Sequence, residues 1–198
     1  MKMPHARTWQ KILVCEYGKP TTADIISSAE ILFREYCVQI PPELPRGSLN
    51  ILHEKVYPGL AVYRSLLENG RDQDTILKLM ESLFQRAFIS RLLPGIRLLN
   101  LLPDPFPIVR YAMRKMAFGQ VGVYDQELVA DTRDTFAFNT HRCLIHDTLI
   151  ALDAGELAPF FCSTDGWLAE ALPKVSWERT QTLGRGGDGC DFRWSRIR

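Results

Sequence analysis

The feature that most constrains the fold of this chain is a change of hydrophobic period near Gly119. Before this glycine, apolar residues recur at helical spacing, as Ile76, Met80 and Leu83 do. After it, apolar and polar residues alternate, as they do over residues 135–139. Helical spacing followed by strand spacing predicts an α+β fold.

Residues 1–118 are predicted to be mainly helical, and residues 119–198 are predicted to contain the sheet and the functional site. We expect the helical N-terminal half to pack on a roughly four-stranded antiparallel sheet with interspersed helices. Strands are predicted around Val121 and Val123 and over residues 135–139, 175–183 and 190–194. Helices are predicted over 142–152 and, in helical or irregular form cut at Pro159, over 156–172.

Length and composition favour a single globular domain that spans residues 1–198. The chain is 46% hydrophobic and 24% charged, and its net charge of +1 gives no electrostatic reason to expect nucleic acid as a partner. Residues 1–8 lack the apolar core of a signal peptide, so we expect a cytoplasmic protein. The apolar stretch at residues 87–102 contains Arg91 and Arg97 and is broken at Pro94, so no membrane span is expected.

Cys143 begins a local group of reactive side chains. With His146 and Asp147 it has the spacing that would place all three on one helix face, and His141 precedes them. Thiolate and imidazole together can bind zinc or form a nucleophile–base pair. The same pattern also arises when Cys143 simply packs inward, and the motif alone favours that simpler interpretation.

Cys162 and Cys190 lie beside further polar groups. Cys162 is close to Asp165, just before Gly166, where we expect a chain break to expose both side chains. Cys190 follows the loop Gly-Arg-Gly-Gly-Asp-Gly, whose backbone N–H groups could bind negative charge. A hairpin that needs positive φ explains these glycines almost as well. The spacing of the cysteines matches no zinc-finger pattern, so it does not show that they converge.

Residues 136–194 resemble the L-2-amino-thiazoline-4-carboxylic acid hydrolase family. The resemblance covers about residues 50–195 and is strong only in the last 60 or so. A looser match lies in Val56-Tyr57-Pro58-Gly59-Leu60-Ala61-Val62-Tyr63. The motifs that carry the strong part are Phe138-Asn139-Thr140-His141-Arg142-Cys143, Glu156-Leu157-Ala158-Pro159 with Cys162 and Asp165, Arg179-Thr180-Gln181-Thr182, and Gly187 with Cys190-Asp191-Phe192-Arg193.

The resemblance implies hydrolytic opening of a small sulfur heterocycle that contains an amidine carbon and carries a carboxylate. Attack at such a carbon needs a thiolate or a metal-bound water, a carboxylate for the cationic amidine and a proton donor. We predict Cys162 as nucleophile or metal ligand and Asp165 as partner of the amidine. Cys143 is predicted as a third catalytic or ligating residue.

The substrate is predicted to be held by arginine and by hydrogen-bonding groups on the strands. Arg179 or Arg193 would bind its carboxylate through a bidentate pair. Asn139 and Thr180 are predicted hydrogen-bonding residues, and Cys190 is predicted to line the site.

Three alternatives stay open at the level of the sequence. A divalent metal held by Cys143, Cys162 and Cys190 fits the residues about as well as a metal-free thiolate. A non-catalytic domain of the 4-vinyl reductase type would instead take an apolar ligand between the sheet and the side chains of Phe84, Phe88, Phe106 and Tyr111. In the third alternative, the helical half forms a homodimer surface and the cysteines are core residues without a chemical role.

Overall fold

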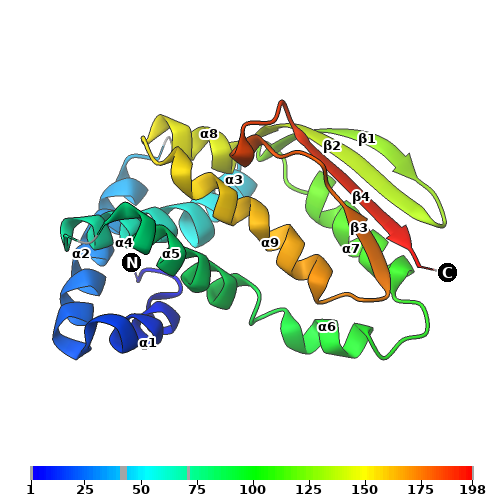
Figure 1. Ribbon diagram of the computed structural model, residues 1–198. Coiled ribbons are helices and arrows are strands. Elements are labelled where there is room, and N and C mark those ends of the chain that lie inside the picture. Colours follow the sequence, from blue (N-terminus) through cyan, green and yellow to red (C-terminus); the bar gives the residue numbers. More distant parts are fainter. Residues whose placement is uncertain (1, 41–43, 71, 198) are drawn as a thin grey trace. The chain divides into compact units, whose positions relative to one another are not determined.

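The computed structural model describes residues 2–40, 44–70 and 72–197 (Figure 1). The chain divides into two compact units, Met1–Phe88 and Ile89–Arg198. The α-helical region ends at Phe118 and the first strand begins at Tyr124, close to the predicted change of structure near Gly119. That the units form one domain stays a prediction.

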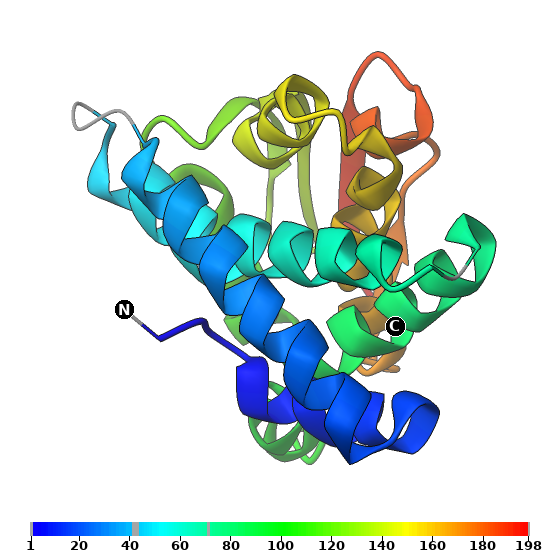
Figure 2. The ribbon, with the colours of Figure 1, turned by 90° about the vertical axis from the view of Figure 1, so that its left-hand side faces the viewer.

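The first unit is helical and is centred on α4. Eight of the first nine residues of α4 are buried, together with Leu66. Pro58 does not interrupt this helix, because it lies in the first turn, where proline costs no hydrogen bond. In Figure 2 the long helix α2 crosses α4, and the two helices are in contact. The elements of this unit are α1 (Ala6–Tyr17), α2 (Lys19–Val38), α3 (Arg46–Ile51), the π-helix η1 (Leu52–Val56), α4 (Tyr57–Glu68) and α5 (Gln73–Phe88).

The second unit contains an antiparallel sheet with the strand order β1-β2-β4-β3. The predicted α+β class with four strands is therefore confirmed. The elements are α6 (Leu93–Leu99), α7 (Phe106–Phe118), β1 (Tyr124–Asp131), β2 (Thr135–Cys143), α8 (Leu144–Ala151), the 3-10 helix η2 (Gly155–Leu157), α9 (Ala158–Glu170), β3 (Val175–Glu178), the 3-10 helix η3 (Leu183–Arg185) and β4 (Cys190–Arg196).

One face of the sheet forms the core of the second unit. Phe136 and Phe138 of β2 and Trp194 of β4 share this face and are buried in one apolar cluster. Phe106 and Val109 of α7 belong to the same cluster, and Leu168 and Ala169 of α9 pack against it. Alternation along the strands sends the intervening residues, among them Asn139 and Arg193, to the opposite face. We call the first the helix-covered face and the second the outer face.

Two sequence predictions near the site are wrong in a way that matters for function. β3 ends at Glu178 instead of running to residue 183. The backbone N–H groups of Thr180 and Gln181 donate to the Asp191 carboxylate, and that of Leu183 donates to the Cys190 sulfur, so side chains take the place of a strand partner. Pro159 does not cut a helix but lies in the first turn of α9.

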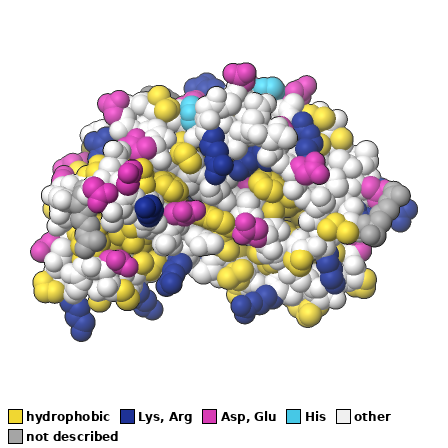
Figure 3. All heavy atoms as spheres, in the orientation of Figure 1, with side chains coloured by type: hydrophobic (Ala, Val, Ile, Leu, Met, Phe, Trp, Pro, Cys, Tyr) yellow, Lys and Arg dark blue, Asp and Glu magenta, His cyan; other side chains and the backbone are white. Residues whose placement is uncertain are grey.

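The apolar stretch at residues 87–102 forms α6 and the turns around it. Ile96 is buried in the core, whereas Leu98 and Leu101 are exposed. Figure 3 shows hydrophobic side chains on the surface over the α6 region. In the described part of the chain, no helix is both long enough and apolar enough to cross a membrane.

The core assignment predicts a large difference between two aromatic substitutions. Trp194→Ala removes a side chain that is 1% exposed, so we expect it to lower the free energy of unfolding by about 3–5 kcal/mol. Tyr111→Ala removes a side chain that is 69% exposed, so we expect a change within about 0.5 kcal/mol. Urea unfolding followed by circular dichroism measures both free energies of unfolding. Equal losses in the two variants would contradict the assignment of Trp194 to the core.

Candidate functional site

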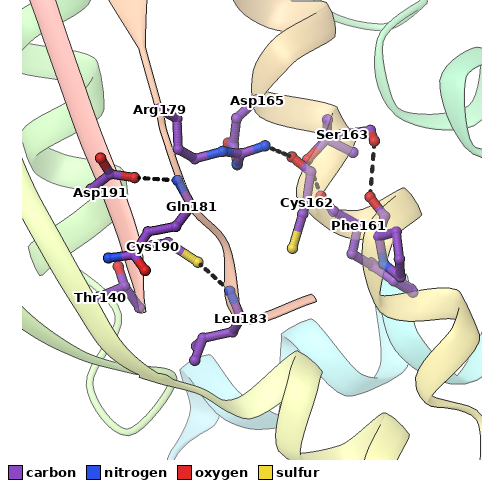
Figure 4. A network of polar contacts seen from close by, with 12 residues as sticks. Thr140, Phe161, Cys162, Ser163, Asp165, Arg179, Gln181, Leu183, Cys190 and Asp191 are labelled. Carbon is purple, nitrogen blue, oxygen red and sulfur yellow. Dashed lines mark hydrogen bonds and ion pairs between the residues drawn. The ribbon is translucent and has the colours of Figure 1, made fainter. Parts of the chain in front are cut away.

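Cys162 projects from one side of α9, which runs without a break through Gly166 to Glu170. The predicted chain break before Gly166 is therefore wrong. The hydroxyls of Ser163 and Thr164 donate to carbonyls one turn earlier, so both side chains are satisfied within the helix. Cys162 is half-buried, and Figure 4 shows its sulfur pointing from α9 toward the segment that contains Leu183.

That segment contacts two sulfur atoms at consecutive residues. The N–H of Leu183 donates to Sγ of Cys190 at 3.3 Å, and Gly184 lies against the sulfur of Cys162. Gly184 is required because a Cβ at this position would lie 2.8 Å from Sγ of Cys162 and 3.0 Å from the backbone of Ala158. The glycine thus allows backbone from the β3–β4 connection to reach the sulfur on α9.

The surroundings of Cys162 favour its thiolate. A hydrogen bond from the Cys190 thiol has the largest effect in lowering the pKa of Cys162, and burial opposes it. Thr182, the Gly184 N–H and the positive charge of Arg179 lower this pKa further. The Thr182 hydroxyl is buried and, in the described part of the chain, has no hydrogen-bond partner of ordinary geometry. Cys190 shows the converse effect, because its interaction with Cys162 and its burial raise its pKa.

Arg179 ties α9 to the connection between β3 and β4. Its guanidinium donates to the Cys162 carbonyl at 3.0 Å and to the Asp165 carboxylate at 3.2 Å. It also lies 5.0 Å from the ring centre of Trp177 and 5.5 Å from that of Phe192, which are cation–π distances. The Arg179 side chain is 8% exposed and that of Asp165 is 27% exposed. Arg179 therefore faces inward, whereas Asp165 still reaches water.

Cys143 is the last residue of β2 and caps α8 in an extended conformation, so it does not share a helix face with His146 as predicted. Burial raises the pKa of Cys143 to about 11. A thiolate at Cys162 raises it slightly further, which places the two cysteines in one electrostatic neighbourhood. Cys143, Cys162 and Cys190 therefore share a neighbourhood, but the surroundings stabilise the thiolate only at Cys162.

Tyr124 is a functional candidate that sequence reasoning missed. It is the first residue of β1 and pairs with Cys143 of β2. Burial raises the pKa of its hydroxyl, and the negative charges of Cys143, Asp165, Cys162 and Cys190 raise it further. The hydroxyl of Tyr124 is therefore kept neutral, and strand pairing places this residue opposite Cys143. No local motif marks Tyr124, and only the β1–β2 register brings it there.

The remaining predicted binding residues lie apart from the thiols of Cys143, Cys162 and Cys190. Arg193 and Asn139 are bonded to each other on the outer face, with the guanidinium 2.9 Å from the amide oxygen. The Asn139 amide and His141 both contact the exposed Glu127. Thr180 is exposed, and its hydroxyl donates to Asp191 at 2.7 Å. Hydrogen bonds from Gln181 and Thr180 outweigh the effect of burial and lower the pKa of Asp191.

The geometry also bears on the metal and apolar-ligand alternatives. Among residues 2–40, 44–70 and 72–197, no group of three or more His, Cys, Asp or Glu side chains is placed to hold a metal ion.

The side chains predicted to line an apolar pocket differ in burial. Phe84 is buried in the first unit and Phe106 in the second, whereas Tyr111 is exposed. Tyr111 borders an open hollow of about 460 Å³ beside α7 that contains none of the predicted site residues.

Comparisons with known proteins place the chain in context. The family model described as L-2-amino-thiazoline-4-carboxylic acid hydrolase matches residues 51–194, and no curated protein matches. The chain is similar to a crystal structure of an Fe(II) unliganded H-NOX protein from K. algicida, with 13% identity and a TM-score of 0.42 over 100% of this chain and 97% of that chain. An S. oneidensis H-NOX protein in the Fe(II)NO ligation state gives 8% identity and a TM-score of 0.38, with 100% of both chains covered. At TM-scores this low, the similarity does not indicate a function for this chain.

The lowered pKa of Cys162 predicts selective alkylation. The thiolate exists above its pKa and is lost as the pH falls through it, so Cys162 should react with iodoacetamide well below pH 9.0, the ordinary thiol pKa. Cys143, with its pKa raised to about 11, should react far more slowly over the same pH range. Peptide mapping of protein alkylated at a series of pH values measures both. Equal pH profiles of alkylation for the two residues would contradict the claim that the fold stabilises the thiolate of Cys162.

Gly184→Ala tests the close contact between the loop and α9. The added methyl group must move the backbone away from Cys162, so the Gly184 N–H bond should weaken and the pKa of Cys162 should rise. At a pH below the Cys162 pKa of about 6, we expect alkylation of Cys162 to slow by about tenfold for each pKa unit gained. Gly95→Ala is the matched control, because a Cβ there meets nothing within 4 Å. Unchanged alkylation in Gly184→Ala would show that the contact is unimportant.

Proposed function

Because this chain belongs to the L-2-amino-thiazoline-4-carboxylic acid hydrolase family, we propose that it hydrolyses a small cyclic amidine such as L-2-amino-thiazoline-4-carboxylate. The product would be of the carbamoyl-cysteine type. The observation that carries the proposal is the half-buried Cys162, whose surroundings stabilise a thiolate on the same helix as the carboxylate of Asp165. A thiolate and a carboxylate on one helix suit attack on a cationic amidine carbon.

In the proposed mechanism the Cys162 thiolate forms a bond to the amidine carbon. The electron pair of its C=N bond moves to nitrogen, and the tetrahedral adduct then expels one ring atom, so the ring opens. The leaving atom takes a proton from Tyr124, whose raised pKa keeps the hydroxyl protonated at neutral pH. Water then attacks the same carbon and releases Cys162 as the thiolate, so the water oxygen ends in the carbamoyl group. One proton of the water returns to Tyr124 and the other goes to solvent.

Asp165 and Arg179 have separate roles in this mechanism. Asp165 is partly exposed and negatively charged, so it can bind the cationic amidine and keep it protonated, which is the form that a thiolate attacks. Arg179 is largely buried and already donates to Asp165 and to the Cys162 carbonyl. We therefore assign Arg179 a positioning role, in place of the predicted contact with the substrate carboxylate.

Active-site substitutions test the proposal. Cys162→Ala should abolish ring opening of L-2-amino-thiazoline-4-carboxylate, and Asp165→Asn should lower kcat/KM by a factor of about 100 or more, on the scale of other charge-stabilising groups. Chromatographic detection of the ring-opened product measures turnover, and thermal unfolding checks that each variant is folded.

Arg193→Lys is the matched control, because Arg193 bonds to Asn139 and to main-chain carbonyls on the outer face. This variant should retain turnover close to that of the parent, whereas Arg179→Lys should lose most of it. Full activity in Cys162→Ala would overturn the proposed nucleophile.

We retain three further expectations as proposals. The substrate is a small molecule, the protein acts in the cytoplasm, and two copies can associate as a homodimer.

A further inference from the structure

Cys162 and Cys190 come from different elements and meet at one short backbone segment. Cys162 belongs to α9 and Cys190 begins β4. Sγ of Cys190 accepts a hydrogen bond of 3.3 Å from the Leu183 N–H, and Sγ of Cys162 lies so close to the next residue that a Cβ on Gly184 would be 2.8 Å from it. Leu183 and Gly184 are consecutive residues, about 3.8 Å apart from Cα to Cα, so both sulfurs lie at one short stretch of backbone. The mutual effect of the two thiols on their pKa values agrees with this placement.

The two cysteines differ in exposure and in charge. Cys162 is half-buried and is favoured as the thiolate, whereas Cys190 is 6% exposed and keeps its proton. An accessible thiolate with a protonated thiol beside it is the arrangement of a redox-reactive cysteine and its resolving partner. The proposed hydrolysis uses the Cys162 sulfur but leaves the Cys190 thiol without a chemical step.

We propose that Cys162 is a site of reversible oxidation by hydroperoxides and that Cys190 resolves the oxidised form as a disulfide. The Cys162 sulfur attacks one peroxide oxygen, the O–O bond breaks, and Cys162 becomes a sulfenic acid while the other oxygen leaves as hydroxide and takes up a proton. The Cys190 sulfur then attacks the sulfenic sulfur. The S–S bond forms, the hydroxyl leaves and takes the Cys190 proton, and a second water results.

The disulfide would regulate the site, and this consequence rests on the proposed function. Oxidation removes the Cys162 thiolate, so ring opening should stop until a dithiol reductant restores it. Capture by Cys190 would also protect Cys162 from irreversible oxidation to the sulfinic acid. Cys143 is the competing partner, but it lies at the end of β2, whereas Cys190 and Cys162 both lie against the Leu183–Gly184 backbone.

Hydrogen peroxide treatment of the full chain, followed by mass spectrometry, tests the proposal without any substrate. Formation of one disulfide lowers the intact mass by about 2 Da, and dithiothreitol reverses the change. Cleavage after Lys and Arg places Cys143 and Cys162 on peptide 143–174 and Cys190 on peptide 186–193. We expect these two peptides to be linked in the parent and in Cys143→Ser, but not in Cys162→Ser.

Cys190→Ser should accumulate sulfenic acid at Cys162, which dimedone traps, and should pass to sulfinic acid faster than the parent. A link that disappears in Cys143→Ser, or equal sulfinic acid formation in the parent and in Cys190→Ser, would overturn the proposal. Turnover should fall in parallel with the disulfide fraction. If the Cys162–Cys190 disulfide forms reversibly but the protein opens no ring, the redox proposal stands and the proposed hydrolase function is wrong.

Discussion

The site depends on the contact between α9 and the residues that precede β4. Gly184 brings its N–H to the Cys162 sulfur, and Arg179 donates to the carbonyl of the same cysteine. Both bonds join elements that are separated in sequence, so neither can form until the sheet and α9 are in place. The charge on Cys162 is therefore a consequence of tertiary structure.

The sheet supplies the rigid frame for this contact. Antiparallel pairing with β2 fixes the start of β4 at Cys190, opposite Thr140. Aromatic packing on the helix-covered face, including the stacked rings of Phe138 and Phe192, holds the strands against α7 and α9. Buried packing of this kind positions a reactive group more precisely than a free loop would.

Hydrophobic period predicted the fold class and the strand count from sequence, because a change from helical to alternating spacing is a local signal. Local signals could not predict the early end of β3, where the Asp191 carboxylate binds the amides of Thr180 and Gln181. Tyr124 was missed for the same reason, since its place opposite Cys143 follows from strand register. Arg193 was assigned to the substrate by residue type alone, without knowledge of which sheet face it occupies.

The central claim is that the fold holds Cys162 as a thiolate, and ultraviolet thiolate absorbance measured against pH tests it most directly. The difference between the parent and Cys162→Ser should show one thiolate that titrates below the ordinary thiol pKa of 9.0. A difference curve that rises only at or above that pH would contradict the account.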